Sequence, residues 1–339
     1  MSLQLQAGIS LKPYNSFGVD VRAQWFAEAH GDADVIEALA YAAQHELPLL
    51  VIGGGSNLLL TADIQALVLR MNSRGIRLLS DDGVRVVVEA QAGEPWHPFV
   101  LSTLAQGWSG LENLSLIPGT VGAAPMQNIG AYGVEIKDVF AGLTALDRQS
   151  GQLREFSLEE CQFGYRDSLF KQAGGRWLIL RVRFALSRVE HLHLGYGAVA
   201  ERLREQGLSQ PSALDVSRAI CSIRSEKLPD PAVLGNVGSF FKNPLVSAAH
   251  AAELKRIHPG LVGYPQADGQ VKLAAGWLIE AAGWKGFRED DAGVHRLQSL
   301  VLVNYGTASG QQLLTLARRI QADIAERFAV ELEMEPNLY

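Results

Sequence analysis

Residues 49–58 read LLVIGGGSNL, an apolar run followed at once by three glycines, Ser56 and Asn57. The apolar run is typical of a buried strand. Glycines let backbone N–H groups approach a phosphate closely, and successive N–H groups can form an anion-binding nest. The stretch therefore indicates either a phosphate-binding loop that follows a strand or a simple tight turn, since glycine is also the commonest turn residue.

The same stretch argues against a Rossmann dinucleotide fold. Gly53 and Gly55 match the first two glycines of GxGxxG, but Leu58 stands where the third is required. Residues 58–63 read LLLTAD and leave little room for a helix before a partner strand predicted at 66–69. The fingerprint needs that helix because its N-terminus carries the pyrophosphate, so a Rossmann fold is disfavoured.

A second and longer glycine-rich segment lies at 117–133 and reads IPGTVGAAPMQNIGAYG, with four glycines, two prolines and no charge. Such a segment cannot fill a core, but it can wrap a large ligand with backbone donors. Loops of this length in compact domains are generally functional or disordered, and a purely structural role would be unusual. Two glycine-rich segments suit a dinucleotide better than a mononucleotide.

Composition narrows the class of protein. The 339 residues predict two or three domains, and a net charge of -6 gives no general attraction to nucleic acid or anionic lipid. An anionic ligand must therefore be held by local groups. Cys161 and Cys221 form no CxxC, so neither a metal site nor a disulfide framework is expected. No signal peptide or membrane-length apolar run is present, which favours a cytoplasmic location.

Periodicity predicts several further elements. Val35, Ile36, Leu39, Ala40 and Ala43 are expected on one face of a helix that Asp32 or Asp34 caps. Capping boxes predict helices after Ser212–Asp215 and after Ser309–Gln312, and a helix over 274–282 should end at Gly283. Strands are predicted at the following ranges: 84–88, 177–184, 299–304 and the strictly alternating 330–335.

Several ordered motifs resemble one enzyme family. They include NSFG at 15–18, GGGSN at 53–57, the segment at 117–133, FGYRDS at 163–168 and GNVGSFFKNP at 235–244. GWLIEAAGWKGF and VHRLQSLVLVN follow in the expected order. From about residue 13 onward the chain thus resembles the UDP-N-acetylenolpyruvoylglucosamine reductase (MurB) family.

The resemblance implies an α+β fold, namely the two-subdomain FAD-binding fold of the vanillyl-alcohol-oxidase (PCMH) type plus a C-terminal α/β substrate-binding domain. The FAD-binding subdomains are expected at 1–70 and 71–215, with a C-terminal strand at 327–339 returning to the second. The substrate-binding domain is expected at 216–326.

The resemblance also implies a reaction. UDP-N-acetylglucosamine enolpyruvate would be reduced to UDP-N-acetylmuramate in a cytoplasmic step of peptidoglycan precursor synthesis that serves cell wall biogenesis, cell shape and cell division. Hydride would pass from NADPH through flavin N5 to the enolpyruvyl β-carbon, and a proton would go to the α-carbon. FAD is expected to be non-covalent, because neither His nor Cys occurs at 53–60 or 115–133. A monomer without metal, nucleic-acid or membrane partners is expected.

That chemistry needs a cation at the substrate carboxylate and a proton donor over the α-carbon, because negative charge develops there. The resemblance implies Arg166 for the carboxylate, which a guanidinium fork matches with two N–H groups. It implies Ser239 as the proton donor. By spacing alone, Arg166 would be a surface residue paired with Asp167, and Ser239 would be an ordinary turn residue.

A third catalytic position is implied among the alternating glutamates near the C-terminus. Glu335 is expected to donate a hydrogen bond to the enolate as a neutral acid, and Glu333 is the alternate. Residues 336–339, PNLY, depart from the family pattern, so the motif does not decide between Glu335 and Glu333.

The remaining site residues follow from the resemblance. The positions expected to bind FAD are Gly53, Gly54, Gly55, Ser56, Asn57, Ser115, Ile117, Pro118, Gly119, Thr120, Gly122, Ala123, Asn128, Gly130, Ala131 and Tyr132. The positions expected to bind substrate are Tyr132, Arg166, Tyr196, Lys227, Asn243, Tyr264 and Gln298.

Two rival functions remain open at this point. One keeps the FAD fold but oxidises a hydroxy acid or a sugar, with oxygen or a quinone as the electron acceptor. The other is a nucleotide-binding regulatory module without turnover. Arg166, Ser239 and a glutamate near 335 argue against the module, because ligand binding alone needs no proton donor.

Overall fold

The computed structural model describes residues 3–339, which form two compact units. Unit 1 comprises the residues up to Ile9, Ala23–Gly54 and Gln65–Glu226. Unit 2 comprises Ser10–Arg22, Gly55–Ile64 and Lys227–Tyr339. The glycine triplet is therefore divided between the units, with Gly54 in the first and Gly55 in the second. The three-part division expected from the sequence stays a prediction.

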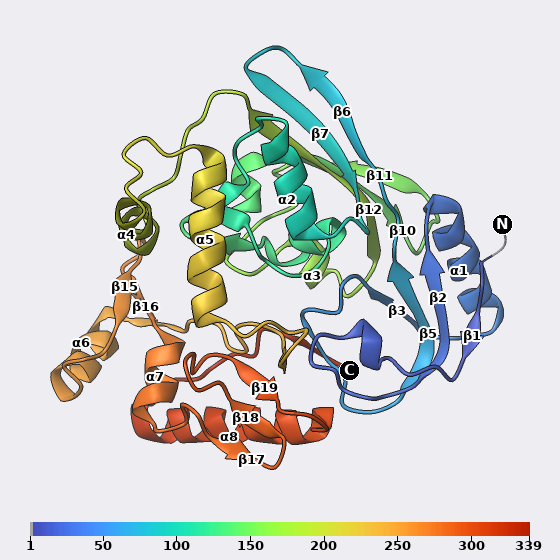
Figure 1. Cartoon of the computed structure of the whole chain (residues 1–339). Coiled ribbons are helices and arrows are strands. Elements are labelled where there is room, and N and C mark those ends of the chain that lie inside the picture. The colour runs from blue at the N-terminus through green and yellow to red at the C-terminus, as the bar shows by residue number, and fades with distance from the viewer. Residues whose placement is uncertain (1–2) are drawn as a thin grey trace. The chain divides into compact units, whose positions relative to one another are not determined.

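The first sheet of unit 1 has four strands in the order β1 (Gln6–Ala7), β2 (Ala23–Ala29), β5 (Ile64–Met71) and β3 (Leu49–Ile52). β3 pairs in parallel with β5, so the strand predicted next to 49–52 is confirmed. Helix α1 (Asp32–Gln44) packs against this sheet (Figure 1). The short strand β4 (Leu58–Leu59) follows the glycine loop, and no helix intervenes.

Two details of α1 differ from the prediction. The buried face consists of Val35, Ala38 and Ala42, whereas Ile36 is 54% exposed. Gly31 is the N-cap, and Asp34 instead accepts hydrogen bonds from the backbone N–H groups of residues 30 and 31. The helix is rich in alanine and has apolar residues on two faces. Which face is buried is therefore decided by the sheet beneath it, which the helical period does not specify.

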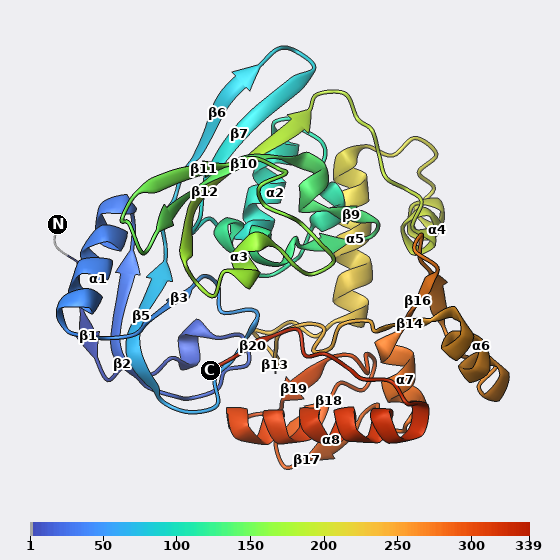
Figure 2. The same ribbon diagram turned by 180° about the vertical axis from the view of Figure 1, so that it is seen from behind.

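The second sheet of unit 1 is antiparallel and has five strands. Their order is β11 (Leu153–Phe156), β10 (Phe140–Asp147), β12 (Trp177–Ser187), β7 (Arg85–Gln91) and β6 (Ile76–Asp81). Figure 2 shows this sheet beside α2 (Trp96–Ala105), with β6 and β7 forming a hairpin. Trp96, Phe99 and Phe184 pack together in the core between them. The strands predicted at 84–88 and 177–184 are thus confirmed.

The rest of unit 1 carries the long glycine-rich segment and two further helices. α4 (Gly197–Glu205) packs against α5 (Ala213–Lys227) through Val199, Leu203, Val216 and Ile220. The predicted capping box of α5 is confirmed, because Ser212 and Asp215 exchange side-chain and backbone hydrogen bonds. The shorter elements are α3 (Leu169–Gln172), β8 (Gly130–Ala131), β9 (Val134–Glu135) and the 3-10 helices η2 (Glu112–Leu114), η3 (Val121–Gln127) and η4 (Ile136–Val139).

Unit 2 is built on two small sheets. One has the order β13 (Gly235–Asn236), β19 (Leu302–Asn304), β18 (Ala292–Val294) and β17 (Arg288–Glu289), and α8 (Gly310–Phe328) lies along it (Figure 1). The other has the order β14 (Leu245–Ser247), β16 (Gln270–Leu273) and β15 (Gly263–Pro265). The other elements are η1 (Lys12–Tyr14), α6 (Ala248–Ile257) and α7 (Ala275–Ala281).

The helix predictions for unit 2 are confirmed. Ser309 and Gln312 form the predicted capping box of α8, whose apolar residues Leu313, Ile320 and Ile324 are buried. α7 ends just before Gly283, which has a φ of 86°. β19 is shorter than the predicted 299–304, since the chain turns between Gln298 and Val301. Within residues 3–339, every helix is too short or too polar to span a bilayer.

The predicted strand at 330–335 is wrong. These residues are extended and make one isolated bridge, between Met334 and Phe241. The alternation itself is real, because Val330 and Leu332 are buried while Glu333 is exposed. The alternation of apolar and acidic residues indicates that one side of the segment is buried. A strand also needs a neighbouring strand with continuous backbone hydrogen bonds. The strand of this region is β20 (Asn337–Leu338), which pairs in parallel with β4 inside unit 2.

Candidate functional site

The two glycine-rich segments meet in unit 1. A Cβ atom on Gly54 would lie 3.0 Å from Cα of Gly119, and one on Gly53 would collide with the hydroxyl of Thr120. A side chain at Gly54 would press against the backbone of Gly119, and one at Gly53 would displace the side chain of Thr120. The sequence identified each segment separately, and the structure brings them together.

Several backbone donors at this junction point to no protein acceptor. Across the residues that the structure describes, no hydrogen bond is made by the N–H groups of Gly54, Gly119 and Thr120. In contrast, the N–H groups of Val121 and the residues after it are used inside the protein. Unused donors on closely packed glycine backbone are the feature expected of a site for a polyanionic ligand such as the diphosphate of a dinucleotide.

Part of the long segment has a structural role. Val121 and Gly122 donate to the carbonyl groups of Glu94 and Ala92, which fixes η3 beside the turn before α2. The buried Asn128 has a φ of 42°. Its side-chain amide donates hydrogen bonds to the carboxylate of Glu135 and to the carbonyl of residue 164. Ile117 packs partly against the core, and the remaining predicted positions of this segment, Pro118, Ala123, Gly130 and Ala131, lie along the same path through unit 1.

Arg166 lies at the tip of a tight turn. Gly164 and Asp167 exchange backbone hydrogen bonds, and Arg166 between them has a left-handed φ of 55°. Its Nη2 donates to the carbonyl of Gly130 at 3.0 Å, which holds the guanidinium against the glycine-rich segment. The carboxylate of Asp167 accepts from Gln172 and from its neighbour Ser168. The turn thus sets the direction of the Arg166 side chain.

Tyr132 and Tyr196, both predicted substrate residues, are in contact. Their ring centroids are 5.2 Å apart in an edge-to-face arrangement. Tyr132 has a φ of 51°, and its carbonyl accepts from Nδ2 of Asn113 at 3.0 Å. Tyr196 is 51% exposed and is the N-cap of α4. One tyrosine is therefore fixed by its backbone and the other is largely exposed on its loop.

Sequence reasoning missed Arg224, a residue of α5 that reaches this region. Its Nε atom is buried and has no partner among residues 3–339. Burial lowers the pKa of Arg224, and the positive charge of Arg166 lowers it further. Positions 217, 221 and 224 share one face of α5, and this polar stripe on a helix was the available signal.

Sequence reasoning also missed His97, on the first turn of α2. Its Nδ1 accepts the N–H of Leu116 at 3.0 Å, just before the glycine-rich segment, where Leu116 has a strained φ of 58°. The ring must be neutral to accept this bond. Ser115, a predicted FAD position, is buried next to it with its hydroxyl 2.7 Å from that of Ser217.

The lowered pKa of the partly buried His97 should be seen in the pH dependence of the protein's stability. Burial, with a smaller contribution from Arg224, lowers the His97 pKa. The unfolded chain then binds more protons than the folded one below about pH 6.5. The free energy of unfolding should fall as the pH drops from there through the lower folded pKa. His97→Gln keeps an acceptor for Leu116 but cannot titrate, so urea unfolding across this window should show a shallower pH slope.

The exposed His191 offers a matched control for His97. His191→Gln should retain the pH slope of the wild type, and the buried His295, whose pKa is also lowered by burial, contributes equally to all three proteins. Equal slopes for His97→Gln and the wild type would contradict the assignment.

Unit 2 holds the other part of the glycine loop. Gly55 has a φ of 65° and lies against the backbone of Tyr14, so any side chain there would collide. The amide of Asn57 donates to the carbonyl of Glu335 at 3.4 Å. The loop is thereby connected to the segment that carries the predicted catalytic glutamate.

Ser239 and Glu335 are neighbours in unit 2. The N–H of Glu335 donates to the carbonyl of Phe240 at 2.9 Å, one residue after Ser239. Ser239 is exposed, whereas Phe240 and Phe241 after it are buried. The buried phenylalanines thus anchor a backbone that presents the serine hydroxyl to the solvent side. Glu333, the alternate, is ion-paired with Lys242, so its carboxylate is already bound to a cation.

The remaining substrate positions are all in unit 2. Oδ1 of Asn243 accepts from the N–H of Ala275 at 3.0 Å, and a Cβ on Gly276 would meet Oε1 of Gln298 at 3.5 Å. Asn243 and Gln298 therefore lie together at the first turn of α7. Lys227 ends α5, and Tyr264 is an exposed residue of β15.

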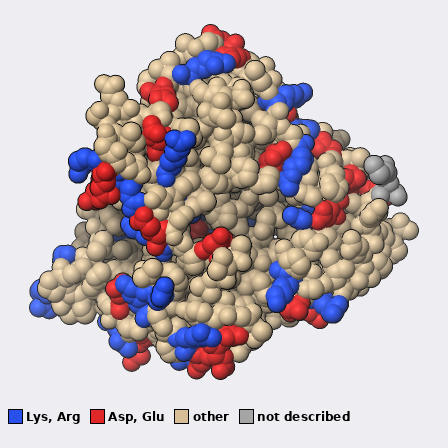
Figure 3. Space-filling model, viewed as in Figure 1, with Lys and Arg blue, Asp and Glu red and all other residues tan. Residues whose placement is uncertain are grey.

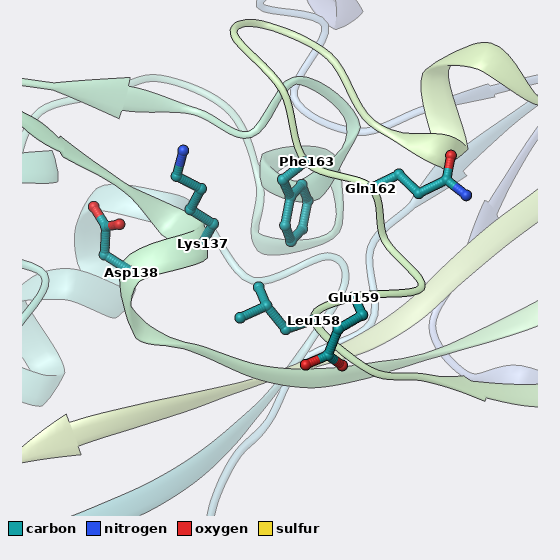
Figure 4. A pocket seen from close by; sticks show the side chains of 6 residues that line it. All are labelled: Lys137, Asp138, Leu158, Glu159, Gln162 and Phe163. Carbon is teal, nitrogen blue, oxygen red and sulfur yellow. The ribbon is translucent and has the colours of Figure 1, made fainter. Parts of the chain in front are cut away.

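Surface features do not identify a competing site. On the face shown in Figure 3, basic and acidic side chains are interspersed. Figure 4 shows a pocket of unit 1 lined by Lys137, Asp138, Leu158, Glu159, Gln162 and Phe163. None of these is a predicted site residue, and Lys137 is already ion-paired with Glu135 at 2.8 Å. We assign this pocket no role in the reaction.

Two family models match the chain. The model described as FAD binding domain matches residues 23–157, and the model described as UDP-N-acetylenolpyruvoylglucosamine reductase, C-terminal domain, matches residues 230–339. Both matches agree with the predicted fold class, in which an FAD-binding fold is followed by a C-terminal domain.

Relatives match over their whole length. The chain is 82% identical over 339 residues to the UDP-N-acetylenolpyruvoylglucosamine reductase of Pseudomonas fluorescens strain Pf-5, covering 100% of both chains. It is 67% identical to that of Pseudomonas aeruginosa, again over 100% of both. The crystal structure of the Thermus caldophilus reductase aligns over 99% of both chains, with a TM-score of 0.68 and 24% identity. This alignment confirms the predicted fold class.

Proposed function

This chain belongs to the UDP-N-acetylenolpyruvoylglucosamine reductase (MurB) family, and on that premise we propose that it reduces UDP-N-acetylglucosamine enolpyruvate to UDP-N-acetylmuramate with NADPH as the reductant. It is an FAD-dependent oxidoreductase of peptidoglycan synthesis. The observation that carries the proposal is the full-length match to reductases of this name, together with an FAD-binding match that contains both glycine-rich segments.

The residues of unit 1 fit FAD. Gly54 and Gly119 approach so closely that a side chain between them would fill the space, and unused N–H groups of both segments are available to phosphate oxygens. Arg224 adds a guanidinium whose buried Nε lacks a partner among the described residues. FAD would be held without a covalent bond. When bound, it would supply the hydride chemistry that links NADPH to the enolpyruvyl β-carbon.

The chain's own residues would bind the substrate and move the proton. Arg166 would bind the enolpyruvyl carboxylate, since a guanidinium keeps its charge and offers two N–H groups to two oxygens. Ser239 would protonate the α-carbon, and Glu335 would donate a hydrogen bond to the developing enolate. The Glu333 carboxylate already has a cationic partner in Lys242, which supports Glu335 for this role.

Several finer properties belong to the same proposal. Tyr132, Tyr196, Lys227, Asn243, Tyr264 and Gln298 would contact the nucleotide sugar. The enzyme would act in the cytoplasm as a monomer, contribute to cell shape and cell division through wall synthesis, and bind neither membrane nor nucleic acid. Loop closure at Tyr196 would exclude water during turnover.

Absorbance spectroscopy tests the reaction directly. The purified protein should carry a flavin spectrum that anaerobic NADPH bleaches and that UDP-N-acetylglucosamine enolpyruvate then restores. A protein that takes up no FAD would contradict the proposal. Rapid return of the colour with oxygen or a quinone, but not with the enolpyruvate, would instead favour the rival oxidase or dehydrogenase activity.

A further inference from the structure

Hydrogen bonds to the turn before α2 fix the glycine-rich segment of unit 1. The carbonyl of Gly119 accepts from the N–H of Trp96 at 3.0 Å, and the N–H of Val121 donates to the carbonyl of Glu94 at 2.9 Å. The N–H groups of Gly119 and Thr120 have no acceptor among residues 3–339. These two unused donors therefore lie on a backbone that is held on their downstream side.

His97 holds the same backbone on the upstream side. Its Nδ1 accepts the N–H of Leu116 at 3.0 Å, and Leu116 has a left-handed φ of 58°. A leucine adopts this conformation only where its surroundings hold it there, because its Cβ atom crowds the backbone. His97 therefore fixes the strained residue that directly precedes the segment.

The bond to Leu116 determines the tautomer of His97. A backbone N–H group is a donor, so Nδ1 must be the acceptor and cannot carry a hydrogen. In the neutral ring the hydrogen is then on Nε2, and Sγ of Cys221 on α5 lies 3.9 Å from Nε2 as its acceptor. A protonated ring carries hydrogen on both nitrogens and cannot accept from Leu116. The upstream contact thus depends on the charge of one side chain.

The charged groups near His97 favour its neutral form. Burial, and then the positive charge of Arg224, lower the pKa of His97, and Arg224 lies one turn beyond Cys221 on α5. The carboxylate of Glu94, three residues before His97, accepts from the N–H of Gly75 at 2.6 Å. The downstream contacts use backbone groups alone, which do not titrate. Protonation of His97 would therefore remove the upstream contact and leave the others.

We propose that His97 is a positioning residue for FAD: its neutral ring fixes Leu116 so that the N–H groups of Gly119 and Thr120 are placed for phosphate oxygens, and protonation of the ring weakens FAD binding. The inference rests on the proposed function, in which FAD lies along this segment. Because binding requires the unprotonated ring, acid favours the protonated, flavin-free protein. The Kd for FAD therefore rises as the pH falls below about 6.5, the ordinary histidine pKa, and is constant above it.

Nitrogen-15 NMR tests the tautomer in the FAD-bound protein. The chain is labelled at the histidine ring nitrogens, and the signals that disappear in His97→Asn are assigned to His97. Their chemical shifts distinguish a protonated from an unprotonated nitrogen. At neutral pH, Nδ1 should be unprotonated and Nε2 protonated. The opposite tautomer, or a doubly protonated ring, would overturn the inference.

The affinity for FAD tests the positioning role. Holoenzyme is ultrafiltered at graded FAD concentrations between about pH 5.5 and 8, and the retained flavin is measured by its absorbance. The wild-type Kd should rise up to about tenfold toward acid, the effect of one lost hydrogen bond. His97→Asn places Oδ1 where Nδ1 was but does not titrate, so its Kd should stay near the neutral wild-type value throughout. His97→Leu lacks the acceptor, so its Kd should be about tenfold higher at every pH.

The exposed His191 supplies the matched control, since His191→Asn should keep the pH dependence of the wild type. Circular dichroism at each pH separates loss of flavin from unfolding. If His97→Leu does not fold, the comparison of His97→Asn with the wild type decides alone, and equal pH dependence in these two proteins would overturn the inference. Failure of the proposed function would be seen separately, as wild-type protein that takes up no FAD at neutral pH or whose reduced flavin the enolpyruvate does not reoxidise.

Discussion

Ser239→Ala is expected to leave reduction of the bound flavin by NADPH unchanged and to slow reoxidation by the enolpyruvate substrate about 100- to 10,000-fold, the usual contribution of a general acid. The proton from Ser239 is needed only when the α-carbon becomes saturated. Stopped-flow absorbance resolves the two half-reactions. The side chain is exposed, and buried Phe240 and Phe241 hold its backbone, so the variant should fold normally.

Two further serine variants complete this experiment. Ser80 is an exposed serine on the edge strand β6, and Ser80→Ala should behave as the wild type in both half-reactions. Ser239→Cys retains an acidic hydrogen and should recover part of the reoxidation rate. If Ser239→Ala slows both half-reactions equally, the serine positions ligands and is not the proton donor.

Gly54→Val is expected to weaken FAD binding about 10- to 100-fold, so that the protein is purified with little flavin. A Cβ atom at this position would lie 3.0 Å from Cα of Gly119, and the branched side chain of valine would extend further into the second segment. The two glycine-rich segments would separate, and their unused N–H groups would no longer converge. The ratio of flavin to protein absorbance and the titration of apoprotein with FAD measure the effect.

Gly31 supplies the matched control for Gly54. A Cβ there has nothing within 4 Å, and its backbone is extended, with a φ of −165°. Gly31→Ala should therefore keep its flavin. Circular dichroism should show that Gly54→Val retains the secondary structure of the wild type. A folded Gly54→Val protein with undiminished FAD affinity would show that the junction of the two segments is not the FAD site.

The sequence predicted those features whose cause is local. The sequence argued against a Rossmann helix after the glycine triplet, because Leu58 stands where the third glycine is required. In the structure, strand β4 follows the triplet where that helix would begin. The capping boxes at Ser212 and Ser309 were predictable because both partners lie within three residues of each other. Fold class and chemistry came from ordered motifs that resemble one family, which composition alone did not indicate.

What escaped prediction depends on distant neighbours. The buried face of α1 is decided by the sheet against which it packs, and a helix with apolar residues on two sides does not reveal which side that is. Arg224 looks like any surface arginine of an amphipathic helix, and only the fold shows that its Nε is buried without a partner among the described residues. The alternation at 330–335 indicated burial correctly but gave no information about hydrogen-bond partners.

The division of unit 2 into three chain segments has a consequence for protein engineering. The region that matches the reductase C-terminal domain, 230–339, is not an autonomous module. The side-chain amide of its Asn304 donates to the carbonyl of Phe17, and the ring centroids of Phe17 and Phe240 are 6.1 Å apart. An excised fragment of these residues would expose that aromatic surface and lose the strand that pairs with β20. Domain swaps between such enzymes should therefore carry residues 10–22 and 55–64 along with the C-terminal part.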